Sequence, residues 1–301
     1  MSNNEQSDAT TRGIAFGGGG LWFLTWTVAY CEAAVEAGIP LDQADLTVGT
    51  SAGSLGAPIL LSGAAKGALT KAEAVAQHPE LMSKVLAAPA PASSQERAAE
   101  ILGSLTDTNS DSILKAGRAA MAAHNPSPEA YVKTLELVLG GIDWPGDKHH
   151  VTAVDCYTGE RLVIDRESSI PLATACAASS SLPGLNGPIW INDQLCMDGG
   201  VSGSSTHSDV VSSADKVLIL SLMRPGSHPH GSFGLSQRTN PKYLNEELAA
   251  IEAKGNKGLL ISADPPEGIN FMDPHGMNQA IDLAHKTFAD TEQQLRDFWG
   301  S

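Results

Sequence analysis

The sequence predicts an α/β fold, and three features of the chain indicate it. Near the start, a short apolar run at 12–16, a helical stretch at 21–37 and a β-prone run at 45–50 follow one another. A helix between two strands predicts a right-handed βαβ unit with parallel strands. Strand-like runs return in the second half, after an alanine-rich, helix-favouring segment at 62–145. We therefore expect a single α/β domain over residues 11–301 with a helical cap insertion at 62–145.

The remaining elements are expected at definite places along the chain. Residues 111–123 and 129–139 show the apolar spacing of amphipathic helices. In the second half we expect a hairpin starting at His149 with its turn at 157–160, a hairpin with the three-residue turn Asn192-Asp193-Gln194, buried strands at 216–222 and 258–263, a surface loop at 225–241 and a closing helix at 277–299. Residues 1–10 are polar and are expected to form a disordered tail.

Composition and charge argue against several classes of protein. The 301 residues carry a formal net charge of −15 without a cluster of Lys and Arg, which argues against a nucleic-acid partner because phosphate binding needs such clusters. The same charge should repel anionic membrane surfaces. Any contact with a membrane is therefore expected to be peripheral and to depend on apolar groups. The oligomeric state is left open by the sequence.

The sequence contains neither a membrane span nor a secretory signal that we can identify. No apolar run approaches the roughly 18 to 20 residues of a transmembrane helix, and the polar start lacks a basic and apolar signal region. The expected location is the cytoplasm. The four cysteines are far apart among apolar or small residues, so we expect buried thiols in place of a zinc cluster or a disulfide framework.

The stretch L-T-V-G-T-S-A-G-S-L at 46–55 contains the pattern G-x-S-x-G at Gly49, Ser51 and Gly53. This pattern is typical of a nucleophile elbow, in which a serine lies on a sharp turn from strand to helix. Glycines on both sides keep side chains from colliding with the strand and the helix, and Ala52 also limits crowding. Ser51 is therefore the candidate nucleophile, although the pattern alone is common and depends on its context.

Four consecutive glycines, Gly17, Gly18, Gly19 and Gly20, separate the first strand from the first helix. A Walker A loop would end in G-K-[ST], and the dinucleotide fingerprint would need another glycine at Trp22 or Phe23, so neither nucleotide motif fits. Backbone amides at the start of a helix can bind an anion, as an oxyanion hole requires. A tight turn that only packs closely explains these glycines equally well. The following helix is apolar around nearly its whole circumference, so it lies in the core or lines a pocket.

A serine hydroxyl needs a partner base before it can attack an ester. In the order of the α/β-hydrolases, the base would be a late histidine, namely His207, His228, His230, His275 or His285. No neighbourhood distinguishes one of these histidines from the others. Asp198 differs because it ends a strand, and Gly199-Gly200 after it let another part of the chain approach closely.

Five blocks of the sequence, taken in order along the chain, resemble the patatin-like phospholipases. They are the four glycines at 17–20, V-G-T-S-A-G-S around Ser51, A-V-D-C-Y-T-G-E at 153–160, A-C-A-A-S-S-S-L-P-G at 175–184 and M-D-G-G at 197–200. The resemblance covers residues 12–63 and 149–222, about half the chain. It implies a three-layer α/β/α domain with a central, mostly parallel sheet.

The resemblance also implies a function and its residues. Ser51 is the nucleophile, Asp198 is the base of a Ser-Asp dyad, and the amides of Gly17, Gly18, Gly19 and Gly20 form the oxyanion hole. The implied activity is hydrolysis of acyl esters in phospholipids, lysophospholipids or neutral lipids, with no cofactor and no metal. Trp22, Phe23 and Ala52 are candidates for the substrate pocket.

The sequence departs from the family pattern at two places. Leu21, Trp22 and Phe23 stand where the family usually carries Arg or Lys, and Ser202–His207 stand where it commonly has Asn and Pro. Three alternatives therefore stay open: an α/β-hydrolase-type triad esterase with a late histidine, an acyltransferase, and a weakly catalytic lipid-binding or interaction module.

Overall fold

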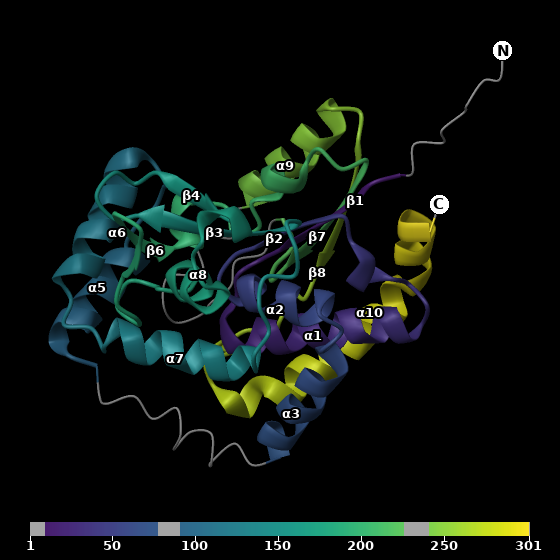
Figure 1. Ribbon diagram of the computed structural model, residues 1–301, viewed down its shortest axis with the longest axis horizontal. Coiled ribbons are helices and arrows are strands. Elements are labelled where there is room, and N and C mark those ends of the chain that lie inside the picture. The colour runs from purple at the N-terminus through teal and green to yellow at the C-terminus, as the bar shows by residue number, and fades with distance from the viewer. Residues whose placement is uncertain (1–9, 78–90, 226–240, 301) are drawn as a thin grey trace.

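A computed structural model describes residues 10–77, 91–225 and 241–300 of the chain, and its strands form one mixed sheet (Figure 1). The strands are β1 (Arg12–Phe16), β2 (Leu46–Gly49), β3 (His149–Asp155), β4 (Arg161–Ile164), β5 (Ile189–Ile191), β6 (Gln194–Asp198), β7 (Lys216–Ser221) and β8 (Lys257–Ser262). The helices are α1 (Gly20–Glu36), α2 (Ala52–Leu61), α3 (Ala65–Gln77), α5 (Ser93–Gly103), α6 (Ser110–Ala122), α7 (Pro128–Leu139), α8 (Leu172–Ser179), α9 (Pro241–Ala253) and α10 (Met277–Gly300). Residues 1–9 of the tail expected at 1–10 and most of the loop expected at 225–241 lie outside the described residues.

The first strands pair in parallel, as the βαβ pattern predicts. β1 lies between β2 and β7, β7 pairs with β8, and β2 pairs with β3, all in parallel. The β1 register aligns Phe16 with Gly49 of β2 and with Leu220 of β7. The carboxyl ends of β1, β2 and β7 therefore lie side by side at the same end of the parallel strands. The glycine loop and the G-x-S-x-G turn both begin there.

The two predicted hairpins form the antiparallel part of the sheet. β3 pairs with β4, and β5 pairs with β6. The three-residue turn expected at Asn192-Asp193-Gln194 is wrong, because Gln194 is already a strand residue and pairs with Ile191. The turn has two residues, and Asn192 adopts a φ of 54°. Tight two-residue hairpin turns need positive φ, which asparagine tolerates well.

Helices cover both faces of the sheet, so the fold has three layers. On one face, α1, α2 and α10 pack in one apolar cluster with side chains of β1, β7 and β8, and α7 and α8 pack on β3 and β5. On the other face, α9 packs on β7, and α5 and α6 pack on β3 and β6. Figure 1 shows α9 on the opposite side of the sheet from α1 and α10. The predicted fold class is confirmed.

The helices of the alanine-rich segment contribute directly to these apolar clusters. Leu135 and Leu139 of α7 pack with β3 and α8, while Ile113 and Ala116 of α6 pack with Val154 of β3. All four cysteines are buried free thiols. Within the described residues, every helix is too short or too polar to cross a bilayer.

Candidate active site

Ser51 lies at a sharp turn between β2 and α2. Its backbone has φ 52° and ψ −116°, a conformation that costs energy for a residue with a side chain. A Cβ on Gly49 would lie 2.4 Å from the carbonyl oxygen of Gly53, and a Cβ on Gly53 would lie 2.1 Å from that of Phe16. Both glycines are therefore required by close backbone approach, which is the structural context that the G-x-S-x-G pattern needs.

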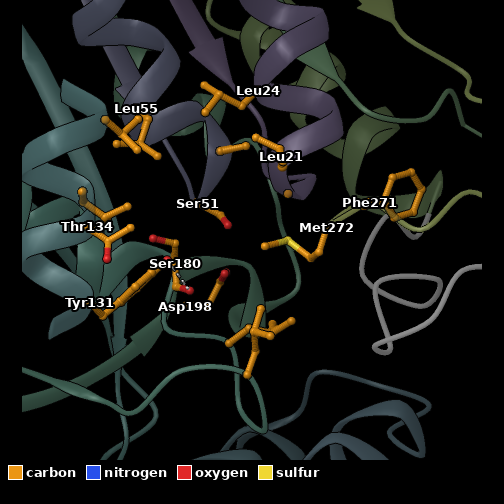
Figure 2. A pocket seen from close by; sticks show the side chains of 16 residues that line it. Leu21, Leu24, Ser51, Leu55, Tyr131, Thr134, Ser180, Asp198, Phe271 and Met272 are labelled. Atoms are coloured by element: carbon orange, nitrogen blue, oxygen red, sulfur yellow. Dashed lines mark hydrogen bonds between the residues drawn. The ribbon is translucent and has the colours of Figure 1, made fainter. Parts of the chain in front are cut away.

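Asp198 is brought toward Ser51 by the pairing of β3. Val151 of β3 pairs with β4 and with Gly49 of β2, and Ala153 pairs with β4 and with Asp198 of β6. Because β4 occupies the same edge of β3 in both cases, β2 and β6 must share the other edge. They run in opposite directions, so their carboxyl ends face each other there. Figure 2 shows the Ser51 and Asp198 side chains at the same pocket.

Two serines at the carboxyl end of α8 and just beyond it, Ser179 and Ser181, form hydrogen bonds with the backbone of Ser51 and Asp198. The backbone amide of Ser51 donates a hydrogen bond to Ser179 Oγ at 2.8 Å, and the amide of Asp198 donates to the carbonyl oxygen of Ser181 at 3.0 Å. The Asp198 side chain is 5% exposed, and its Oδ1 accepts a hydrogen bond from the amide of Gly200 at 2.8 Å. The sequence offered these serines only as part of a family block, without a role.

The glycine loop lies against Ser51, but its four amides differ. The amide of Gly17 donates to the carbonyl oxygen of Leu220 at 2.9 Å, and that of Gly18 donates to Ser205 at 3.1 Å. A Cβ on Gly18 would lie 3.2 Å from Ser51 Cβ. Among the described residues, none accepts a hydrogen bond from the amides of Gly19 or Gly20, which lie at the start of α1.

The start of α1 is held by a turn from the far end of the chain. The amide of Trp22 donates to the carbonyl oxygen of Phe271 at 3.0 Å. Gly20 has a φ of 66°, and a Cβ there would lie 2.7 Å from the same carbonyl oxygen. This turn therefore fixes the glycine loop by close backbone contact.

A cavity of about 210 Å³ opens beside Ser51 and Asp198. Its lining is mostly apolar and comes from α1, α2, α7, the segment after α8 and the 271–272 turn. The lining residues are Gly20, Leu21, Leu24, Ser51, Ala52, Leu55, Tyr131, Thr134, Leu135, Val138, Ser180, Leu182, Leu185, Asp198, Phe271 and Met272. Ala52, a candidate for the substrate pocket, is among these lining residues.

Trp22 and Phe23 are not part of this lining, which corrects their assignment to the pocket. Both are fully buried in the core, where Trp22 contacts Phe271 edge to face and Phe23 stacks on Trp26. Leu21 and Leu24 of the same helix face the cavity instead. A helix that is apolar all round gives no sign of which face lines a pocket.

Tyr131 is the largest polar side chain of the cavity wall that the sequence did not single out. Its hydroxyl donates to the carbonyl oxygen of Ser180 at 3.4 Å. Burial raises the pKa of Tyr131 to about 12, and the Asp198 carboxylate adds to that rise in pKa. Tyr131, Thr134, Leu135 and Val138 follow one another at helical spacing on α7, which is a signal that the predicted helix 129–139 already contained.

In the part of the chain that the structure describes, the late histidines lie outside the lining of this cavity. His207 is buried, and both its ring nitrogens have protein partners. His275 is exposed and pairs with Asp273, and His285 is exposed on α10. His228 and His230 lie outside the described residues. None of the described residues that line the cavity is a histidine.

The fold and this site define an α/β protein with a serine at a strand-to-helix elbow and an aspartate at the end of a facing strand. Residues 14–208 match the model of the patatin-like phospholipase family, so the chain belongs to that family. The resemblance stated from the five sequence blocks is thereby confirmed.

Solved structures give weaker similarities. The crystal structure of the type III effector protein ExoU has a TM-score of 0.40 and 16% identity, covering 95% of this chain and 53% of that chain. The complex of full-length SpcU with full-length ExoU from Pseudomonas aeruginosa has a TM-score of 0.37 and 17% identity, with the same coverage of 95% and 53%. The chain thus spans about half the length of these solved chains. A comparison with curated proteins found no match.

Proposed function

We propose that this protein hydrolyses acyl esters of lipids through a Ser51-Asp198 dyad. Membership in the patatin-like phospholipase family supports lipid hydrolysis. The observation that carries the dyad is the meeting of β2 and β6 on one edge of β3, which brings the elbow serine and a buried aspartate to one apolar cavity.

In the proposed reaction, Asp198 carries every proton that moves. Its carboxylate takes the proton of Ser51 Oγ as the oxygen attacks the ester carbonyl, and returns this proton to the departing alcohol. A water then enters, loses a proton to Asp198 and attacks the acyl-serine. The bond to Ser51 breaks, Oγ regains the proton, and the fatty acid leaves.

The oxyanion hole is proposed at the amides of Gly19 and Gly20. The amides of Gly17 and Gly18 already donate to carbonyl oxygens, so they hold the loop in place. The start of α1 adds the positive end of a helix dipole, which favours the negative charge that develops on the substrate oxygen during attack.

The cavity wall supports an acyl chain as its occupant. The lining side chains near Ser51 are mainly leucines, with Phe271 and Met272 on one side. Burying each methylene of a chain against such a wall contributes about 0.8 kcal/mol. No Lys or Arg is among the described residues of the lining, which favours neutral or zwitterionic lipids over anionic ones.

The three alternatives make different predictions. A triad esterase needs a histidine beside Ser51, but none of the described residues that line the cavity is a histidine, and both ring nitrogens of His207 have protein partners. An acyltransferase would share the acyl-serine step but need a second acceptor. A binding module would not react covalently at Ser51, so labelling by a fluorophosphonate separates it from an enzyme.

The decisive experiment compares single variants with p-nitrophenyl esters as substrates. Ser51→Ala should abolish hydrolysis and fluorophosphonate labelling while the protein stays folded. Asp198→Asn should lower kcat by about 10²- to 10⁴-fold, because an amide keeps the shape but cannot accept the proton. Asp193→Asn, on the exposed turn before β6, is the matched control and should retain full activity.

Replacement of each late histidine tests the triad. If one histidine variant folds and is as inactive as Ser51→Ala while Asp198→Asn stays active, the dyad is wrong. Full hydrolysis by Ser51→Ala would end the proposal that Ser51 is the nucleophile. Hydrolysis that depends on Ser51 but is slower than transfer of the acyl group to added alcohols would favour the acyltransferase.

A further inference from the structure

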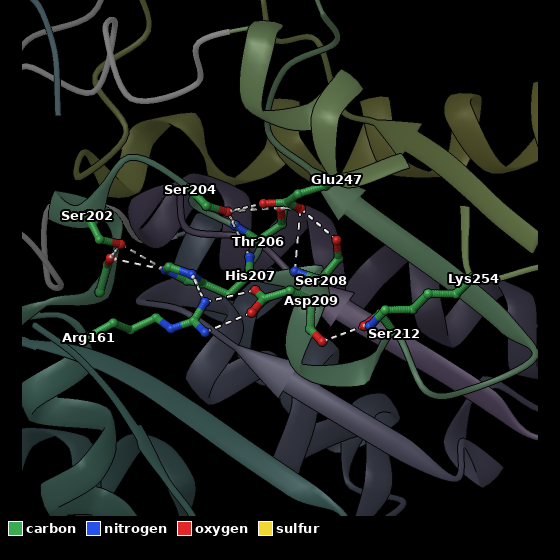
Figure 3. Close-up of polar contacts among 11 residues, drawn as sticks. Arg161, Ser202, Ser204, Thr206, His207, Ser208, Asp209, Ser212, Glu247 and Lys254 are labelled. Carbon is green, nitrogen blue, oxygen red and sulfur yellow. Dashed lines mark hydrogen bonds and ion pairs between the residues drawn. The ribbon is translucent and has the colours of Figure 1, made fainter. Parts of the chain in front are cut away.

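The residues just after Asp198 contact both halves of the proposed site. We call 199–208 the linking segment; Figure 3 shows its polar contacts. At its start, the Gly200 amide donates to Asp198 Oδ1, and farther along the Ser205 carbonyl oxygen accepts the hydrogen bond from Gly18 in the glycine loop. This segment contains Ser202–His207, where the sequence departs from the family pattern. The geometry of the base and of the glycine loop therefore depends on this segment.

His207 is the last residue but one of the linking segment and is 2% exposed. Arg161 Nη1 lies 3.0 Å from Nδ1, and the carbonyl oxygen of Gly199 lies 3.1 Å from Nε2. A guanidinium only donates hydrogen bonds and a carbonyl oxygen only accepts them. Nδ1 must therefore be the acceptor and Nε2 must carry the proton. The ring is neutral in this arrangement, since a second proton on Nδ1 would remove the acceptor that Arg161 needs.

The surroundings of His207 favour the same protonation state. Burial lowers the pKa of His207, and the charge of Arg161 lowers that pKa further. Arg161 is itself oriented by Asp209, whose two carboxylate oxygens accept from Nη1 at 2.8 Å and from Nη2 at 2.7 Å. A two-point ion pair of this kind fixes the guanidinium plane.

Glu247 of α9 holds the rest of the linking segment. Its carboxylate accepts from Ser204 Oγ, from Thr206 Oγ1 at 2.6 Å and from Ser208 Oγ at 2.8 Å. Ser204 Oγ in turn accepts from the amide of His207 at 2.8 Å. The segment is thus fixed from β4 on one side and from α9 on the other.

We propose that His207 is a positioning residue for Asp198, acting through its Nε2–H hydrogen bond to the Gly199 carbonyl. This inference rests on the proposed function of the dyad. The hydrogen bond fixes the Gly199–Gly200 peptide, whose N–H donates to Asp198 Oδ1, while Arg161 selects the tautomer that can donate it. His207 does not touch the substrate, so its loss should lower kcat and leave KM unchanged. A displacement of about 1 Å at a reacting group can cost roughly 100-fold in rate.

Three variants test this role with p-nitrophenyl esters. His207→Leu removes the ring's hydrogen bonds with Arg161, Gly199 and Ser202 and should lower kcat by roughly 10- to 100-fold with KM within about twofold of the original protein. His207→Gln keeps one donor and one acceptor in a neutral side chain, so it should restore most of the kcat that leucine loses. Lys254→Met is the matched control. Lys254, just after α9, donates a hydrogen bond to Ser212 Oγ at 2.5 Å, outside the linking segment, so kcat should not change.

Arg161→Leu keeps the test decisive if His207→Leu does not fold, because it changes a partly exposed side chain and leaves His207 in place. It should lower kcat in the same direction. Imidazole ¹⁵N chemical shifts of the original protein, with the His207 signals assigned by their loss in His207→Gln, should show a neutral ring protonated on Nε2 at pH 7. In Arg161→Leu the same signals should shift toward a mixture of tautomers.

The inference is overturned if folded His207→Leu keeps full kcat, or if His207 is charged or protonated on Nδ1 at pH 7. It is also overturned if both His207 variants fold and are as inactive as Ser51→Ala, which would make His207 the base. Failure of the proposed function looks different, because the original protein and Ser51→Ala would then hydrolyse esters at the same rate.

Discussion

Gly53→Ala should destabilise the protein because the helix of the elbow packs directly on the backbone of β1. A Cβ at position 53 would lie 2.1 Å from the carbonyl oxygen of Phe16, while such contacts are essentially never below 3.0 Å, so the two must separate by about 0.9 Å. Phe16 is fully buried, and its carbonyl oxygen accepts the amide of Thr50 at 3.1 Å. Movement of this strand therefore also disturbs the turn that carries Ser51.

The size of the effect follows from three contributions to the free energy of unfolding. Overpacking in a close-packed core costs about 3 kcal/mol, and weakening the Thr50 hydrogen bond costs about 1 kcal/mol. Alanine gains about 1 kcal/mol of helix propensity over glycine. We expect a net loss of about 3 kcal/mol, together with a loss of ester hydrolysis in the fraction that remains folded.

Urea unfolding followed by circular dichroism measures this loss. The matched control is Gly67→Ala on α3, where an added Cβ meets no atom within 4 Å, and it should leave stability unchanged or raise it by about 0.5 kcal/mol. If Gly53→Ala unfolds at the same urea concentration as the original protein and keeps full esterase activity, the close approach of α2 to β1 has no energetic role.

Three further measurements test the pocket, the charge and the buried histidine. Val138→Trp, in the lining of the cavity, should lower kcat/KM for long-chain p-nitrophenyl esters by roughly tenfold and leave kcat/KM for p-nitrophenyl acetate unchanged. Leu137→Trp, at a position that is 82% exposed and outside the lining, should change kcat/KM for neither ester. Equal effects of the two variants would contradict the cavity as the acyl site. Vesicles of phosphatidylcholine should be hydrolysed faster than those of phosphatidylglycerol at low salt, and added salt should narrow the difference by screening; the reverse order would contradict the charge argument. Burial, with a smaller contribution from His150, lowers the pKa of His149 to about 3, so the unfolded chain binds the extra proton and stability falls as the pH drops below about 6.5. This residue should account for about 2 kcal/mol of the loss between pH 7 and pH 5, and His149→Gln should remove that part; parallel stability curves for the two proteins would refute it.

The elements that could be predicted from the sequence have strong local signals. The first strand, the glycine loop, the long helix and the elbow were all expected within a few residues of their observed bounds, because glycines and apolar runs mark them directly. The close contacts of Gly49 and Gly53 agree with the steric reason given for them. Parallel pairing followed from the βαβ order alone.

The pocket could not be predicted in the same way, because its wall is made of tertiary contacts. Leu21, Tyr131, Leu182 and Met272 come from four distant parts of the chain and meet only after folding. The short helix α8 consists mainly of alanine and other small residues and is buried on nearly all sides, so it has no helical periodicity to detect. The contact of His207 with the Gly199 carbonyl could not be predicted either. From the order of residues alone, His207 was only one of five candidate bases.

The dependence of the glycine loop on residues late in the chain has a consequence for synthesis of the protein. The family match ends at residue 208, yet the acceptor for Gly17 is Leu220 on β7, and the acceptor for Trp22 is Phe271. A nascent chain that has emerged from the ribosome only to residue 208 holds Ser51, Asp198 and Ser205 but lacks the carbonyl groups of Leu220 and Phe271, two of the three that hold the loop and the start of α1. If the dyad acts as proposed, esterase activity should therefore arise only after residues 271–272 have been synthesised and their turn has docked on α1.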